Sequence, residues 1–122
     1  MKIVQMKILE KRIYEDFDNK DGFRILADRL WPRGMKKEDA KIDLWAKEIS
    51  PSNELRKLYH GKEIDFNDFS QKYLKELNEN PDSQSFLTEI KKYETVTLMT
   101  SVKEIEVSEL PVLKKFIEKN LG

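Results

Sequence analysis

Apolar residues recur along the chain with two different spacings. In the segment 66–77 they follow one face of an α-helix, at Phe66, Phe69, Tyr73, Leu74 and Leu77. Pro81 is expected to stop this helix. The same spacing recurs in 83–93 and in 110–117, where Ser108 is the expected N-terminal cap. The pattern predicts three helices in the second half of the chain.

Short runs rich in β-branched residues predict strands between the helices. The segment 95–100 reads TVTLMT and predicts a central strand. The segment 23–27 predicts another strand, because it follows the turn-forming sequence DNKDG at 18–22. One further strand is expected within 1–14, where apolar residues are frequent and no helix cap is present.

The middle of the chain predicts a turn followed by a helix. The apolar residues of 42–49 suggest a short amphipathic turn. In the following Ser-Pro-Ser sequence, a serine can cap a helix that runs to about Leu58. His60 and Gly61 are expected to end this helix, with Gly61 in the left-handed conformation.

Strands that alternate with helices predict an α/β layered fold, with a short, largely parallel sheet flanked by helices. We expect one domain over residues 1–122. In parallel sheets ligands usually meet the carboxyl ends of the strands. If the strands at 23–27 and 95–100 are parallel, then Arg29, Arg33, Ser101 and Lys103 emerge at one edge of the sheet.

Composition excludes several classes of protein. Lysine plus arginine and aspartate plus glutamate number 23 each, so no global charge favours nucleic acid or an anionic membrane. The chain has no cysteine, which excludes disulfides, thiol nucleophiles and zinc-thiolate sites. Charged residues interrupt the N-terminal segment, and no apolar stretch approaches the ~20 residues that span a bilayer. We therefore expect a cytoplasmic protein without a membrane partner; the oligomeric state is not predicted.

The heptapeptide DRLWPRG at 28–34 carries the strongest chemical signal. Two of the five arginines flank a tryptophan there, whereas lysine supplies most of the positive charge elsewhere. Arginine is favoured where a planar bidentate donor binds phosphate or carboxylate. Arg29, Arg33 and Lys103 are thus predicted to bind an anion, with Trp31 beside them. In the structural alternative, Arg29 pairs with Asp28 or Asp43, and Trp31 is a core residue whose N–H meets a carbonyl.

Other candidate groups are weaker. Asp28 is a candidate acid/base because it is a carboxylate at a strand end beside cations; the alternative is an ion pair that holds the loop. Asp43 is a candidate for the rim of the pocket. His60 is the single histidine, which excludes a multi-histidine metal site and favours a structural role. No metal site is predicted, no cofactor is identified, and no dinucleotide or nucleoside triphosphate motif is present.

The motifs DRLWPRG, DLWAKEISPS and ELRKLYH resemble the YeaO-like family, known as domain of unknown function 488. The resemblance runs from about Arg12 to Leu77 and resumes from Val96 to Lys103. It implies a small prokaryotic α/β domain without an established activity. The matching positions are Asp28, Arg29, Trp31, Pro32, Arg33, Gly34, Asp43, Trp45, Lys47, Pro51, Ser52, Leu55, Arg56 and Lys103.

The C-terminal part departs from the resemblance. Relatives typically show an acid and then an Asn-His-Ala-like stretch after the lysine, whereas this chain reads EIEVSE at 104–109. A histidine is therefore missing. If that histidine serves chemistry in relatives, this chain has an altered activity or none.

Three functions remain open at this point. The leading hypothesis is an α/β domain that binds a small anionic or phosphorylated ligand, with Asp28 as acid/base in a reaction of unknown class. The alternative is a non-catalytic regulatory module for protein or nucleic acid. In the third, the loop at 28–34, called the arginine loop below, only stabilises the fold.

Overall fold

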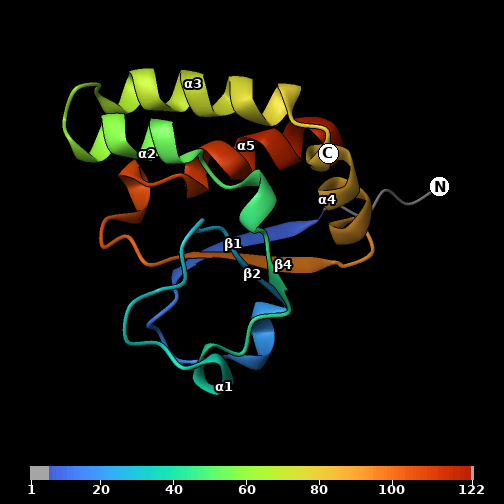
Figure 1. The fold of residues 1–122 in the computed structure, drawn as a ribbon. Helices are drawn as coiled ribbons and strands as arrows, with labels where there is room; N and C mark the ends of the chain where they lie inside the picture. The colour runs from blue at the N-terminus through green and yellow to red at the C-terminus, as the bar shows by residue number, and fades with distance from the viewer. Residues whose placement is uncertain (1–5, 122) are drawn as a thin grey trace.

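The fold is built on a four-stranded sheet whose paired strands are all parallel (Figure 1). The computed structural model describes residues 6–121. The strands lie in the order β1-β4-β2-β3, and they are β1 (Lys7–Arg12), β2 (Phe23–Leu26), β3 (Leu44–Trp45) and β4 (Thr95–Thr100). The predicted parallel α/β class is confirmed. Of the segment expected to hold the first strand, residues 1–5 lie outside the described part.

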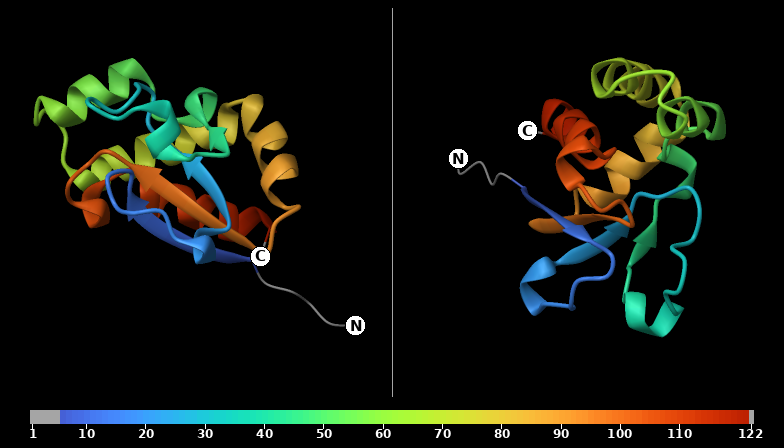
Figure 2. Two further views of the ribbon diagram at one scale, coloured as in Figure 1. Left: turned by 90° about the horizontal axis from the view of Figure 1, so that it is seen from below. Right: turned by 90° about the vertical axis from the view of Figure 1, so that its left-hand side faces the viewer.

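The larger helices gather on one face of the sheet (Figures 1 and 2). They are α2 (Asn53–His60), α3 (Phe66–Glu79), α4 (Asp82–Ile90) and α5 (Leu110–Leu121). The short α1 (Lys37–Ala40) lies on the opposite side. The part of the chain that the structure describes also contains three 3-10 helices, η1 (Asn19–Asp21), η2 (Lys47–Ile49) and η3 (Ile105–Val107).

The alternation of side chains along the central strands divides the core in two. Ile25 and Leu98 face the large helices and belong to the main apolar cluster. Leu26 and Met99 face the other way and belong to a smaller cluster, against which Trp31 packs. A loop with α1 therefore covers the face of the sheet that the large helices leave open.

Most helix ends follow the sequence pattern. The Ser52 hydroxyl accepts a hydrogen bond from the Leu55 N–H at 3.2 Å, as expected for the cap of α2. The prediction of a left-handed conformation at Gly61 is wrong. Gly61 has φ −79°, and the next residue, Lys62, has the positive φ of +60°. The Gly61 N–H still donates to the Lys57 carbonyl, as in a helix, so the left-handed residue lies one position later than predicted.

The turn expected at 42–49 is only partly correct. It contains the two-residue strand β3, which pairs with the end of β2. Backbone bonds from Asp43 N–H to Arg24 C=O and from Ala46 N–H to Leu26 C=O hold it in place. The pairing comes from a strand about twenty positions away, so the local pattern does not indicate it.

Candidate functional site

Asp28 joins the carboxyl ends of the two central strands. Its Oδ1 accepts a hydrogen bond from the Thr100 hydroxyl at 2.7 Å, and its Oδ2 accepts one from the Ser101 N–H at 2.8 Å. The Ala27 N–H also bonds the Met99 carbonyl at 2.9 Å. The structure thus brings the loop after β2 against the end of β4, as the parallel arrangement predicted.

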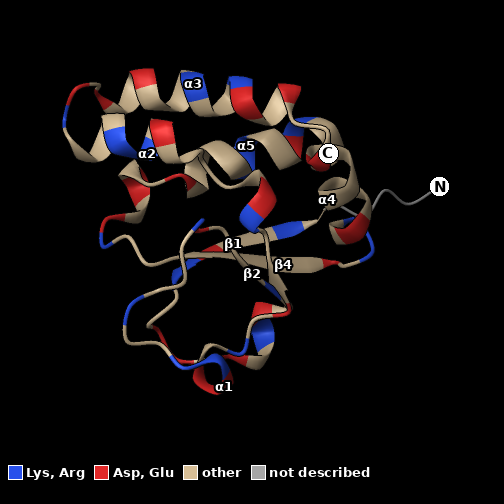
Figure 3. Cartoon of the chain, in the orientation of Figure 1, with Lys and Arg blue, Asp and Glu red and all other residues tan. Residues whose placement is uncertain are grey.

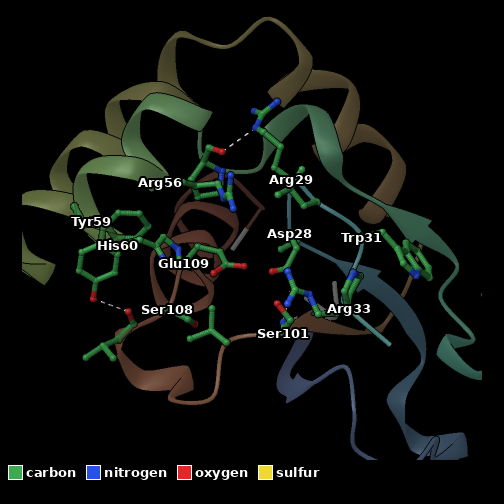
Figure 4. Close-up of a pocket in the computed structure, with 17 residues that line it drawn as sticks. Asp28, Arg29, Trp31, Arg33, Arg56, Tyr59, His60, Ser101, Ser108 and Glu109 are labelled. Carbon is green, nitrogen blue, oxygen red and sulfur yellow. Dashed lines mark hydrogen bonds between the residues drawn. The ribbon is translucent and has the colours of Figure 1, made fainter. Parts of the chain in front are cut away.

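A cavity of about 370 Å³ opens beside Asp28 (Figure 4). Its walls come from the arginine loop, from α2 and from the segment that leads into α5. This volume lies within the range of small-molecule sites, roughly 300–1,000 Å³. Among the lining residues are Asp28, Arg29, Trp31, Arg33, Arg56, Tyr59, His60, Ser101, Ser108 and Glu109.

Arg29 is held by backbone carbonyl groups. Its Nε donates to the Pro51 carbonyl and its Nη2 to the Ser50 carbonyl, both at 2.8 Å. Neither Asp28 nor Asp43 is its partner in these bonds, so the ion pair considered from the sequence is not the arrangement found. Arg29 attaches the loop after β2 to the turn before α2, and it is also one of the residues that line the cavity.

Trp31 has the contacts of a core residue. Its indole N–H donates to the Met35 carbonyl at 2.7 Å. The ring lies edge-on to Trp45, with 5.2 Å between centroids, and packs on the smaller cluster. Trp31 therefore shapes the wall of the cavity while fixing the loop to the sheet.

Two arginines and the histidine supply exposed or half-exposed basic groups at the cavity. Arg33 comes from the arginine loop and is exposed; among the described residues it has no ion-pair partner. Arg56 and His60 come from α2, one turn apart. Arg56 bonds the Asn53 side chain at 3.2 Å, a neighbour on its own helix. These side chains have N–H groups that form no hydrogen bonds within the described part of the fold and can donate to an anion.

Glu109 is a buried acid on the wall of the cavity, 6% exposed. No described donor reaches its Oε2. Figure 4 shows its carboxyl group directed toward Asp28. Burial, and then the neighbouring Asp28 charge and a hydrogen bond between the two side chains, raise the pKa of Glu109 well above its usual range. A protonated Glu109 carboxyl group can donate a hydrogen bond, which an ionised carboxylate cannot.

The sequence-predicted residues do not all meet at the cavity. Asp28, Arg29, Trp31, Arg33 and Ser101 line it, whereas Asp43 and Lys103 do not. The Asp43 carboxylate accepts the Arg24 backbone N–H at 2.9 Å, beside β3. Lys103 is exposed in the loop beyond β4, past the point where the chain contacts Asp28.

The sequence reasoning missed Arg56, Ser108 and Glu109 as residues of the site. Arg56 was a matching position of the resemblance, which could have marked it. Ser108 and Glu109 fall in the segment where the chain departs from that resemblance. Their position follows from the packing of α5 and η3 against the sheet; Tyr59, whose hydroxyl donates to the Val107 carbonyl at 2.8 Å, attaches this segment to α2.

Within residues 6–121, no cluster of three or more aspartate, glutamate or histidine side chains could hold a metal ion. Over the same residues, no helix has the length and apolar character needed to cross a membrane.

Fold and cavity together define a small parallel α/β protein with a basic and acidic pocket at the ends of its central strands. Comparison with known protein families identifies the family to which this chain belongs. Residues 7–122 match the model described as "Inactive DUF488-N3 subclade". The chain therefore belongs to the DUF488 family, as the resemblance implied.

Two relatives span nearly the same length. "Uncharacterized protein YeaO" of Escherichia coli is 43% identical over 112 residues, covering 92% of this chain and 97% of the relative. "Uncharacterized protein Rv3073c" of Mycobacterium tuberculosis is 34% identical over 116 residues, covering 93% and 95%. No solved structure matches the chain significantly.

Proposed function

We propose that this protein binds a small anionic ligand in the strand-end cavity without converting it. The observation that carries the proposal is that Arg33 and Arg56, from two different segments of the chain, line the same cavity. Two arginines at one cavity can bind one phosphate or carboxylate group through several N–H donors. Lys103, which we expected to share this role, is left out of the ligand set because it does not line the cavity.

Binding without turnover is supported by two further points. The description of the subclade as inactive favours it. Asp28, the candidate acid/base, already accepts hydrogen bonds from the Thr100 hydroxyl and the Ser101 N–H. A carboxylate committed in this way maintains the junction of the strands and is a poor general base.

A macromolecular partner is the second interpretation. Acidic and basic residues are interspersed along the helices in Figure 3, whereas a nucleic-acid site requires a basic patch or stripe. The cavity favours the small ligand.

Inorganic phosphate tests the proposal directly. We expect phosphate to shift NMR amide signals of the arginine loop and of α2, and Arg33→Ala to weaken its affinity at least about tenfold. Lys103→Ala is the matched control, since it removes an exposed cation near the same sheet edge but outside the cavity; its affinity should stay within about twofold of the parent. Unchanged affinity in both Arg33→Ala and Arg56→Ala contradicts the proposal.

A further inference from the structure

Glu109 sets a condition on what the cavity can bind. An acidic side chain lies beside the arginines proposed to hold an anion, and it is almost fully buried. If Glu109 were ionised, it would add a second negative charge next to Asp28 and repel an anionic ligand. The neutral, protonated form removes this repulsion, and it leaves a carboxyl group that both donates and accepts hydrogen bonds.

The cavity thus has two chemically different regions. Arg33 and Arg56 present guanidinium groups, while Asp28 and the buried Glu109 present two neighbouring carboxyl groups. A volume of about 370 Å³ holds more than a single small anion. Hydroxyl groups match a carboxyl pair well, because each hydroxyl can accept from the protonated acid and donate to the other.

We propose that the ligand is a small phosphorylated sugar, whose phosphate binds Arg33 and Arg56 and whose hydroxyl groups bind Glu109 and Asp28. Glu109 is then a specificity-determining residue. This inference rests on the proposed function, because it assigns the anionic end of the ligand to the same arginines.

The first test compares two ligands of equal charge by isothermal titration calorimetry. Ribose 5-phosphate carries hydroxyl groups, and n-butyl phosphate carries none. We expect the protein to prefer ribose 5-phosphate at least about tenfold. Glu109→Leu should abolish this preference while butyl phosphate still binds, and Glu109→Gln, which retains a donor and an acceptor, should keep most of it. Arg33→Ala should weaken both ligands.

The outcomes separate the two proposals. Equal affinity for ribose 5-phosphate and butyl phosphate contradicts the proposal of a phosphorylated sugar, but it agrees with the proposal of an anion site. Absence of binding by either phosphate overturns both. If Glu109→Leu fails to fold, two other measurements test the role of Glu109. They are the preference of the parent protein for ribose 5-phosphate over butyl phosphate and the pH dependence of phosphate binding by Glu109→Gln.

In that pH series, ionisation of Glu109 should weaken the binding of both phosphates as the pH rises. Glu109→Gln should remove this part of the loss, whereas a merely structural Glu109 predicts parallel curves. The other charged or titratable groups around Glu109 are Asp28 from the loop after β2, Tyr73 from α3, Arg29 and Arg33 from the arginine loop, and Arg56, Tyr59 and His60 from α2. A His60→Gln variant measures the contribution of the histidine, and the titration of the phosphate itself cancels between variants.

Discussion

At the scale of single residues, the contacts separate the arginines by role. Arg24 is fully buried and bonds Asp21 together with the carbonyls of Ala40 and Lys41. Arg29 is half-buried and bonds two carbonyls, whereas Arg33 offers its guanidinium to solvent. The sequence places Arg29 and Arg33 symmetrically around Trp31, so only the structure shows that Arg29 is bound to backbone carbonyls and that Arg33 is exposed.

This difference predicts opposite effects of the same substitution. Arg29→Met should lower the free energy of unfolding by about 2 kcal/mol or more, because two carbonyls lose charged donors. Arg33→Met should change it by no more than about 0.5 kcal/mol, as expected for an exposed side chain. Urea denaturation followed by circular dichroism measures both. Equal destabilisation by the two variants would show that Arg33 also stabilises the fold.

At the scale of elements, the local pattern was most informative where an element has its own periodicity or cap. The strand at 95–100 and the helix over Phe66–Glu79 agree closely with the pattern. The two-residue β3 and four-residue α1 were not predicted, since elements so short carry too little pattern and depend on pairing or on a tertiary neighbour. Ser52 was expected as a cap, but its bonds to Glu76 on α3 were not.

Ser52 therefore connects two helices as well as capping one. Its hydroxyl donates to Glu76 at 2.5 Å while accepting from the Leu55 N–H. We expect Ser52→Ala to reduce the free energy of unfolding by about 1–2 kcal/mol, since the cap is lost. Ser52→Thr keeps the hydroxyl and should retain most of that stability in the same urea denaturation. A Ser52→Ala protein as stable as the parent would contradict the capping role.

At the scale of the whole molecule, the sheet topology explains why the cavity residues at the strand ends lie together. Parallel strands bring Asp28 and Ser101 together, and the sequence was sufficient to predict that edge. Arg56 and Glu109 reach the cavity because α2 and α5 pack over one face of the sheet, and no local pattern encodes where a packed helix places a given side chain. The carboxyl pair therefore emerged only from the three-dimensional arrangement.

Two buried acids with opposite pKa shifts give the molecule a defined pH dependence of stability. Burial favours a higher pKa for Asp21, but hydrogen bonds from the Asp18 backbone N–H, Lys11 and Arg24 lower its pKa below the ordinary 3.8. The stability that Asp21 contributes is thus present above that value and is lost as the pH falls through the lower pKa of the folded state.

Glu109 changes the stability of the fold at higher pH than Asp21 does. Folded protein keeps a proton that the unfolded chain releases above the ordinary pKa of 4.5, so stability declines as the pH rises from there toward the raised pKa. Glu109→Gln removes this titration but leaves Asp21 intact. In urea denaturation at about pH 5 and pH 8, the variant should gain stability relative to the parent at the higher pH, and both should lose it alike below about pH 4. Parallel curves from pH 5 to 8 would mean that Glu109 is already ionised in the folded protein.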